Sequence, residues 1–600
     1  MPRPASTLMR RRALPRWMTL AAMTLSMCLL LMSLLARAAP AAADDGVQTT
    51  TGVIDGAAYI IQVPGNWNGT LLLWSHGYRA PGGPNPAEDA PAALGPTLLA
   101  QGYALAGSSW SATGWAVQPA LRDQMALLNY FQANIGTPRR VIAWGGSLGG
   151  LVTGGLLANN SDRFDGALAL CGVMAGSPGA WNLSLDGGFV FKTLVAPQSS
   201  LQLVNITNPT LNAGTAVQAL DAAQATSQGR ARIALAAAVS STPGWFTALT
   251  PEPAPTDFAA RQLNQYLWLK NVGVPFTFGY RANMEQFAGG NPSSNTAVSY
   301  QLQLENSGLR PMVEALYQQA GLDLNADLAR LEVAPRIDAN PYALDYLARY
   351  IAFDGRLNRP MLTLHTTNDG LVPVQNEQAY QSVTVAAGSG QLLRQMYVQR
   401  AGHCTFSPAE VLTALSALER RVTTGQWGDT GNVVALNTQA AALGPAYNVI
   451  SPSAGTVIPA APAFAAYQPS AFLRPYTTLP PNLDDSYVTS LDPKSANGPS
   501  GAGVIVVSAT AGAYRVRVTM SGLKPGSSHA LRFHRGTCVL PGPVLLPMPN
   551  LVADASGTAT ITAWVGNRDW AAIVSEAAYL DVNERGSAPF GPVIACGNVN

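Results

Sequence analysis

Short apolar runs of strand length alternate with stretches of helical periodicity between about residues 52 and 172. Strands that alternate with helices in this way form a parallel sheet whose two faces are covered by the helices. The sequence therefore predicts an α/β domain with a doubly wound, mostly parallel sheet. The candidate strands are 71–75, 103–106, 141–144 and 167–170, and the candidate helices are 121–131 and 148–158.

The alternation stops between about residues 175 and 358, where helical patterns dominate and strand signals are scarce. A helical insertion inside a sheet domain commonly covers the ends of the strands, so we expect a large helical lid. The predicted sheet domain as a whole covers residues 44–452. After the insertion, the expected elements are a strand at 361–364, a helix at 376–385, a strand at 394–398 and a helix at 408–422.

The C-terminal part of the chain differs in composition and in residue pattern. Residues 453–500 are rich in Pro, Ala and Ser, which predicts a wrapping segment or linker. Beyond it, residues 514–519 alternate in polarity and turn signals follow, so we expect a small all-β sandwich over residues 501–600.

The first residues have the pattern of a secretory signal. A basic stretch precedes an apolar run over 18–36, and small residues then offer cleavage motifs at 36–38 and 41–43. We expect a signal peptide over residues 1–43 and a secreted or extracytoplasmic protein, in the periplasm or at the cell surface, with no stable membrane insertion after cleavage. The alternative is an uncleaved membrane anchor, because the run is nearly long enough to span a bilayer.

Charge excludes one class of partner. The chain has 36 Lys and Arg against 34 Asp and Glu, and no basic cluster stands out beyond the N-terminus. Binding to nucleic acid needs a clustered basic face, so we do not expect a nucleic-acid partner.

A serine stands where a nucleophile could be presented. Ser147 lies in Gly145-Gly146-Ser147-Leu148-Gly149, directly after a candidate strand and before a candidate helix. This is the context of the G-x-S-x-G elbow, whose tight turn requires small neighbours and whose helix N-terminus stabilises developing negative charge. The alternative interpretation is an ordinary Gly-rich turn.

An acid and a histidine follow at later strand ends. Asp369 comes after the strand that ends near His365, and His403 lies in a loop just past the next strand. Of the three histidines in this domain, His365 falls within a strand, where packing is its expected role, and the side chain of His76 is expected to fill a buried loop. His403 is therefore the candidate base.

Residues from about 52 to 425 resemble the alpha/beta-hydrolase superfamily, in which the triad follows the chain order Ser, Asp, His. The HG step of residues 76–77 ends the first strong strand, where this superfamily places a second oxyanion donor. The resemblance implies an enzyme that needs no cofactor. It implies Ser147 as nucleophile, His403 as general base, Asp369 as orienting acid, and the backbone N–H groups of Tyr78 and Leu148 as the oxyanion hole.

The His403-Cys404 step is similar to the tannase and feruloyl esterase group. There, a cysteine beside the histidine is bonded to one beside the serine, whereas Gly146 precedes Ser147 in this chain. A phenolic ester is accordingly one possible substrate.

Four of the five cysteines follow the predicted signal peptide, an even number for an oxidising compartment. Cys171 ends the strand beside the one that bears Ser147, and Cys404 follows His403. Both positions lie at the same edge of the active site, so we expect a Cys171–Cys404 disulfide. The alternative is two buried free thiols.

The small domain resembles the copper-zinc superoxide dismutase sandwich in residues 522–526, 529–534, 536–538 and 595–597. This resemblance implies a Cys538–Cys596 disulfide. Arg532 and Asn583 stand where histidine ligands are expected, which leaves His534 alone. One histidine cannot make a site that wants three or four ligands, so we expect a metal-free accessory module.

The leading functional hypothesis is an esterase that acts on a small-molecule or polymeric ester through an acyl-enzyme. The alternatives are a serine peptidase with the same triad and a non-catalytic binding protein on the same fold. The esterase leads because the predicted lid offers apolar and aromatic residues and no obvious charged pocket. Packing within the lid is the alternative role of these residues, which are Trp181, Phe189, Phe191, Trp245 and Phe246.

Overall fold

The computed structural model describes residues 46–598 except 454, 477–486, 494–501, 511–512, 567–568, 571–572 and 574–577. The predicted signal peptide and its cleavage motifs lie outside the described residues. None of the helices in the described part is long and apolar enough to cross a membrane.

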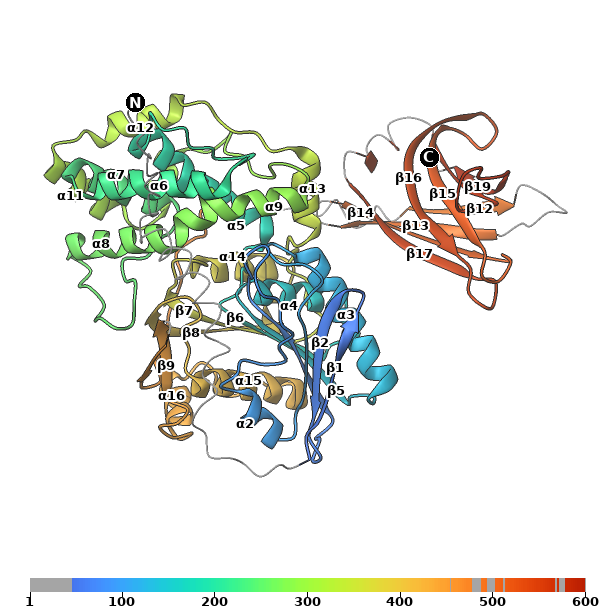
Figure 1. The fold of residues 1–600 in the computed structure, drawn as a ribbon, viewed down its shortest axis with the longest axis horizontal. Coiled ribbons are helices and arrows are strands. Elements are labelled where there is room, and N and C mark those ends of the chain that lie inside the picture. The colour runs from blue at the N-terminus through green and yellow to red at the C-terminus, as the bar shows by residue number, and fades with distance from the viewer. Residues whose placement is uncertain are drawn as a thin grey trace, which may run out of the picture.

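A nine-stranded sheet in the order β1-β2-β4-β3-β5-β6-β7-β8-β11 forms the centre of the larger domain (Figure 1). The run from β4 to β8 is parallel, and β1, β2 and β11 are antiparallel additions. The predicted α/β fold class is confirmed. The strands are β1 Gln48–Ile54, β2 Ala57–Val63, β3 Thr70–Ser75, β4 Ala104–Ser108, β5 Arg140–Gly146, β6 Gly166–Leu170, β7 Met361–Asn368, β8 Leu393–Ala401 and β11 Phe464–Ala465.

Helices cover both faces of this sheet because its central strands are apolar on both sides. Along β5, Val141 and Ala143 belong to one hydrophobic core, while Ile142 and Trp144 belong to the other. Such continuous burial is typical of parallel strands. The first core includes residues of α3 Val117–Asn134 and α4 Leu148–Asn159, and the second includes residues of α2 Gly95–Ala100 and α15 Pro408–Thr424.

The region between β6 and β7 is helical, as the sequence indicated, and lies above the sheet domain in Figure 1. Most of these helices share a hydrophobic core of their own. We call this region the helical insertion. Its elements are α5 Gly176–Val190, η1 Phe191–Val195, α6 Pro209–Gln224, α7 Ser227–Val239, α8 Phe258–Trp268, η2 Leu269–Gly273, η3 Phe276–Tyr280, α9 Arg281–Ala288, α10 Tyr300–Asn306, α11 Arg310–Ala320, α12 Leu324–Val333 and α13 Pro341–Arg349.

A segment after the sheet domain ties the helical insertion to the sheet. Residues 464–474, which we call the strap, begin with β11 on the sheet edge and continue along α14 Gln375–Ala386, where the Phe472 amide donates to Gln378 Oε1 (2.8 Å). The strap ends with Arg474, whose guanidinium contacts the fully buried Asp186 carboxylate of α5 at 2.7 Å. The strap thus joins three parts of the larger domain. Between β8 and the strap lie α15, α16 Val433–Ala441, β9 Val449–Ser453 and β10 Thr456–Pro459.

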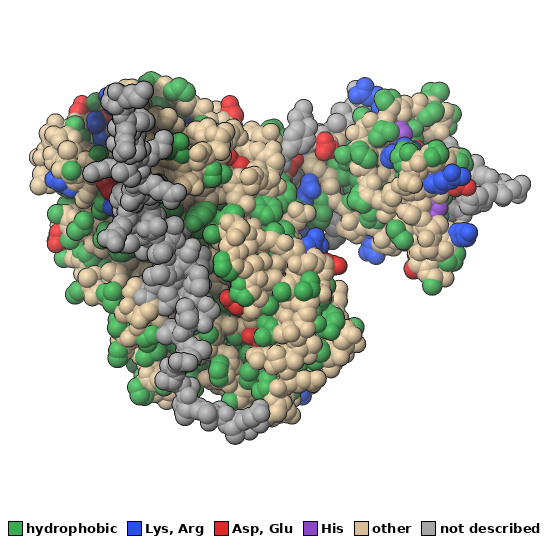
Figure 2. Space-filling model, viewed as in Figure 1, with side chains coloured by type: hydrophobic (Ala, Val, Ile, Leu, Met, Phe, Trp, Pro, Cys, Tyr) green, Lys and Arg blue, Asp and Glu red, His purple; other side chains and the backbone are tan. Residues whose placement is uncertain are grey.

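The C-terminal domain is an antiparallel assembly of eight strands with its own core. Cys538 and Cys596 are bonded with a Cα separation of 5.9 Å, which confirms that predicted disulfide. The domain protrudes from the molecule on the side of α13 (Figure 1) and forms a separate lobe in the space-filling view (Figure 2). Its first strand, β12, falls inside the range expected to be linker. The strands are β12 Tyr487–Pro493, β13 Ala502–Thr510, β14 Ala513–Ser521, β15 Ser528–Gly536, β16 Pro541–Val552, β17 Ala559–Gly566, β18 Ala578–Asn583 and β19 Val593–Asn598.

The three residues at the expected metal-ligand positions of this domain are linked by polar contacts. His534 Nε2 lies 3.1 Å from Asp581 Oδ2, and Arg532 Nε lies 3.7 Å from Asp581 Oδ1. Arg532 also donates to Asn583 Oδ1. Arg532 thus contacts both Asp581 and Asn583, and His534 lies beside the same Asp581 carboxylate.

Candidate active site

Ser147 occupies the turn between β5 and α4, at φ 58° and ψ −123°. A non-glycine residue at positive φ is uncommon, and here it is imposed by the tight reversal from strand to helix. The neighbouring glycines make room for that reversal. A Cβ on Gly149 would lie 2.0 Å from the carbonyl oxygen of Ser75, and one on Gly145 would lie 2.5 Å from the carbonyl oxygen of Gly149.

The two residues expected to supply the oxyanion hole, Tyr78 and Leu148, line the same pocket as Ser147. Leu148 is the first residue of α4, so its N–H has no partner within the helix and lies at the positive end of the helix dipole. Tyr78 follows Gly77 at the end of β3. A Cβ on Gly77 would lie 3.4 Å from Ser147 Cβ, which shows how closely this loop approaches the serine.

Asp369 and His403 meet at the carboxyl ends of β7 and β8. His403 Nδ1 donates to Asp369 Oδ2 at 2.6 Å, so in the neutral ring Nε2 carries no proton. The other oxygen, Asp369 Oδ1, accepts from the backbone N–H groups of Leu371 (2.9 Å) and Val372 (3.0 Å). The buried carboxylate is thus held on both oxygens.

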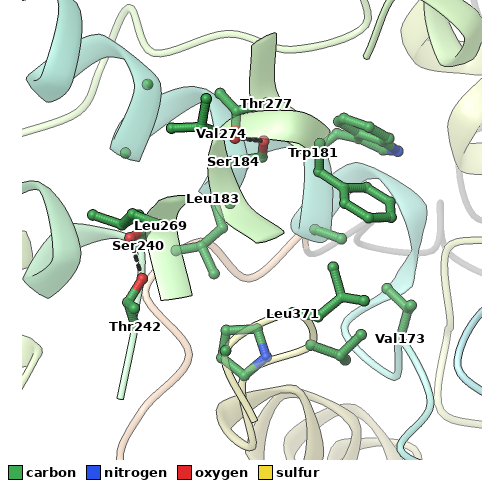
Figure 3. A pocket seen from close by; sticks show the side chains of 18 of the residues that line it. Val173, Trp181, Leu183, Ser184, Ser240, Thr242, Leu269, Val274, Thr277 and Leu371 are labelled. Carbon is green, nitrogen blue, oxygen red and sulfur yellow. Dashed lines mark hydrogen bonds between the residues drawn. The ribbon is translucent and has the colours of Figure 1, made fainter. Parts of the chain in front are cut away.

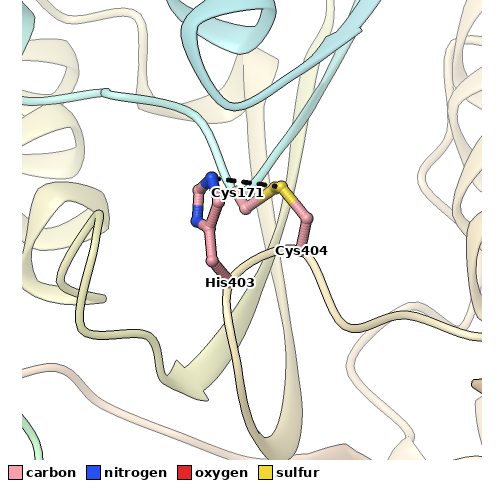
Figure 4. Close-up of side chains that lie close together, drawn as sticks. All are labelled: Cys171, His403 and Cys404. Carbon is pink, nitrogen blue, oxygen red and sulfur yellow. Dashed lines mark hydrogen bonds between the residues drawn. A yellow bond between two sulfur atoms is a disulfide. The ribbon is translucent and has the colours of Figure 1, made fainter. Parts of the chain in front are cut away.

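The Cys171–Cys404 disulfide is present, with a Cα separation of 5.3 Å, as the positional argument predicted. Cys171 follows β6, and the preceding residue, Leu170, accepts a hydrogen bond from the backbone N–H of Ser147 at 2.9 Å. His403 lies beside the bridge, with Nε2 3.6 Å from Cys404 Sγ (Figure 4). The disulfide therefore links the end of β6, next to Ser147, to the loop that carries His403. It also leaves neither sulfur as a thiolate for metal binding.

The other two histidines of this domain lie in the interior. His76 contacts the carbonyl oxygens of Gly77 (2.6 Å) and Ser109 (3.0 Å), and burial, aided by the charge of Arg79, lowers the pKa of His76 to about 3. His365 is fully buried and contacts Glu377. The structure brings neither of them to Asp369 Oδ2 as closely as it brings His403.

A pocket lies between the sheet edge and the helical insertion, with Ser147 in its wall. Leu183 of α5 and Leu371 of the loop after β7 face it from opposite sides (Figure 3). None of the described lining residues is charged. The lining hydroxyls of Ser184 and Thr277 bond to each other at 2.9 Å, so that part of the wall presents few free polar groups. The aromatic lining residues are Tyr78, Trp115, Trp181, Phe191, Phe276 and Phe278.

Only part of the aromatic set singled out in the sequence reaches this pocket. Trp181 and Phe191 line it. Phe189 instead stacks on Tyr300 inside the helical insertion, with ring centroids 5.3 Å apart. Trp245 and Phe246 both contact Trp268, Trp245 through its carbonyl oxygen and Phe246 through its ring.

Sequence reasoning missed four aromatic residues of the lining. Trp115 precedes α3, and Phe276 and Phe278 lie in the π-helical segment η3. Tyr78 was singled out for its backbone alone. A π-helical turn shifts the face that each residue presents, so a pattern with a 3.6-residue period does not reveal it.

This chain is similar to known hydrolases. Residues 102–176, which include the serine turn, match the prolyl oligopeptidase family. An o-phthalyl amidase of Xanthobacter agilis is 32% identical over 407 residues, which cover 63% of this chain and 87% of that protein.

Solved structures with similarity to this chain include an esterase from Aspergillus oryzae, at 11% identity and a TM-score of 0.31, over 71% of this chain and 88% of that one. A superoxide-dismutase-like protein from Bacillus subtilis is 17% identical, with a TM-score of 0.17, over 19% of this chain and 98% of that one. The extent and identity of the amidase match decide the relationship. This chain belongs to the same family as the o-phthalyl amidase, among the serine hydrolases of the alpha/beta-hydrolase fold.

Proposed function

We propose that this protein hydrolyses carboxylic esters with Ser147 as nucleophile, His403 as general base and Asp369 as the group that orients it. The observation that carries the proposal is the 2.6 Å contact between Asp369 and His403 at the sheet edge where Ser147 is presented. Roles in a triad are recognised by such geometry rather than by sequence position.

The reaction proceeds in two halves. His403 Nε2 accepts the Ser147 hydroxyl proton as Oγ attacks the ester carbonyl, and the N–H groups of Tyr78 and Leu148 stabilise the oxyanion. His403 then gives its proton to the leaving alcohol. Water attacks the acyl-enzyme with the same histidine as base, and His403 returns this proton to Ser147 Oγ as the acyl–oxygen bond breaks and the acid product leaves.

The pocket favours a substrate with an apolar, aromatic acyl group. Its wall is aromatic and aliphatic, and it contains no charged side chain among the described residues. An apolar pocket with a few polar groups near the reacting atoms is the usual form of a small-molecule site. We therefore propose aryl or arylacyl esters rather than charged ones.

A small aromatic amide is the second candidate substrate. The specific observation in its favour is the 32% identity with an amidase of o-phthalyl compounds. The same triad serves ester and amide bonds, because both reactions pass through a tetrahedral oxyanion. The amide demands more of His403, which must protonate a poorer leaving group.

We propose that the protein works outside the cytoplasm. Two disulfides in one chain support this location, because such bonds persist in oxidising compartments.

The test compares p-nitrophenyl benzoate, p-nitrophenyl acetate, benzoyl p-nitroanilide and a short peptide amide as substrates. Ser147→Ala should lower turnover on the order of a millionfold. Ser556→Ala, in the sandwich, is the matched control and should keep full turnover. A fluorophosphonate should label Ser147, as peptide mass mapping would show. A purified Ser147→Ala protein that still turns over, or labelling at another serine, would refute the proposal.

A further inference from the structure

Glu377 and His365 form a second carboxylate–imidazole pair, which contacts Asp369 and has no role in the triad mechanism. Glu377 comes from the first turn of α14, and His365 comes from the middle of β7. Both side chains are completely buried. A buried ionisable pair is costly unless its hydrogen bonds are all made, so its presence calls for an explanation.

Both ring nitrogens of His365 face oxygen acceptors. Nδ1 lies 2.9 Å from Glu377 Oε1, and Nε2 lies 2.8 Å from the carbonyl oxygen of Val372. A neutral imidazole has only one N–H and would turn a lone pair toward one of these oxygens. The geometry therefore fits an imidazolium that donates twice. Burial alone would lower the pKa of His365, but the hydrogen bond and charge of Glu377 outweigh it and raise the pKa above its usual value.

The second oxygen of Glu377 is also satisfied. Glu377 Oε2 accepts from Thr363 Oγ1 (2.5 Å) and from Gln395 Nε2 (2.7 Å). Thr363 lies on β7 and Gln395 on β8, so the carboxylate bridges the two strands that carry Asp369 and His403. Both carboxylate oxygens of Glu377 thus have at least one donor, as a stable buried network requires.

The pair contacts Asp369 in two ways. His365 Nε2 lies 3.7 Å from Asp369 Oδ2, the oxygen that holds His403. In addition, Val372 accepts from His365 through its carbonyl and donates to Asp369 Oδ1 through its N–H. The turn that fixes the Asp369 carboxylate is thus itself anchored on His365.

We propose that Glu377 and His365 form a permanent buried ion pair that holds Asp369, and through it His403, in the reactive orientation. They are positioning residues, because neither lines the pocket or touches the reacting atoms. The proposal rests on the proposed function of Ser147, His403 and Asp369. It adds a cationic histidine and a second acid to the site.

The charge of His365 has a direct consequence for the pH profile. A positive charge near the Asp369–His403 pair opposes protonation of His403. Loss of that charge should move the acid limb of the pH profile of kcat/KM to higher pH. The other titratable side chains close to the Glu377–His365 pair are the hydroxyls of Tyr380 and Tyr397, which interact with Glu377. Among the described residues, no other cation therefore replaces His365 there.

The first experiment compares His365→Gln and Glu377→Gln with the unmodified enzyme. A glutamine at 365 keeps a donor for the Val372 carbonyl but carries no charge. Both variants should lower kcat about tenfold or more, because a small displacement of a catalytic group slows the reaction strongly. KM should stay within about twofold of its value in the unmodified enzyme. Both should also shift the acid limb of the pH profile upward, because without the Glu377 carboxylate burial lowers the pKa of His365 and its positive charge is lost as well. The double variant removes both charges together and serves if either single variant does not fold.

His529→Gln is the matched control. His529 is also a buried histidine with partners on both ring nitrogens, Ser527 Oγ and the carbonyl oxygen of Asn583, but it lies in the sandwich. Its replacement should leave kcat, KM and the pH profile unchanged. Folded variants at His365 and Glu377 with unmodified kcat and pH profile would overturn the inference.

The second experiment measures the charge of His365 without any substrate. In protein labelled with ¹⁵N-histidine, the resonances lost in His365→Gln should show two protonated ring nitrogens from pH 6 to pH 8. A neutral ring in that range would overturn the inference even if the enzyme is active. An enzyme inactive on every ester and amide, but with a doubly protonated His365, would instead overturn the proposed function alone.

Discussion

Replacing Cys171 and Cys404 together by alanine should lower both stability and turnover. The two cysteines are 233 residues apart in the sequence, and the chain-entropy model gives about 5 kcal/mol for closing a loop of that length. Turnover should fall as well, because Cys404 directly follows His403 and loses its bond to the strand beside Ser147. The loss of kcat should be about tenfold, since the loop keeps the bonds from Thr366 Oγ1 to the Gly402 carbonyl (2.7 Å) and from the Gly402 N–H to the Asn368 carbonyl (3.1 Å).

The assay is urea unfolding followed by tryptophan fluorescence, together with kcat and KM on the best ester. The matched control replaces Cys538 and Cys596 by alanine. That bridge spans 58 residues, so its removal should cost about 4 kcal/mol in the sandwich and leave kcat unchanged. If the Cys171/Cys404 variant kept both its stability and its kcat, the idea that this bridge restrains His403 would be refuted. A loss of stability with full kcat would show that the bridge is structural only.

Three further outcomes follow from single contacts. Gly149→Ala should abolish activity, because its Cβ would lie 2.0 Å from the Ser75 carbonyl oxygen; a folded variant with full kcat would contradict this. Arg474→Ala should lower the free energy of unfolding by about 3–5 kcal/mol in urea melts, because it leaves the Asp186 carboxylate buried without its cation. Burial raises the pKa of Asp89 to about 6, and its Oδ2 has no partner among the described residues, so the folded state prefers the protonated acid. The stability that Asp89 contributes should therefore be lost as pH rises from about 4 to 6, and Asp89→Asn should raise stability by up to about 3 kcal/mol at pH 8 and by little at pH 4.

The sheet and its connections could be predicted from the sequence because β3 to β6 are mostly apolar and β7 begins with an apolar run, while the helices between them are amphipathic or rich in small residues. The β5–Ser147–α4 unit follows from the glycines that the turn requires. The hairpin of β1 and β2 was not foreseen, since the residues of β1 are half-buried or exposed and give a weak pattern. Strand β11 has only two residues, too few for any periodic signal.

Some residues of the candidate site could likewise be predicted from the sequence, and others could not. Asp369 and His403 could be predicted because each follows a recognisable strand, and parallel strands end at one edge. Glu377 could not be predicted, because an acid in the first turn of a helix usually serves the helix dipole at the surface. Only the packing of α14 on β7 and β8 directs it inward, toward His365 and Gln395.

The strap has a consequence for how substrates enter. A flap-like opening of the helical insertion would have to separate Arg474 from the buried Asp186, at a cost of about 3–5 kcal/mol. At equilibrium, fewer than about one molecule in a hundred would then be open. The helical insertion should therefore stay closed on the sheet domain, and the enzyme should select substrates by whether they fit the closed pocket. Its rate should rise smoothly with substrate concentration, without a jump when the substrate forms droplets or micelles.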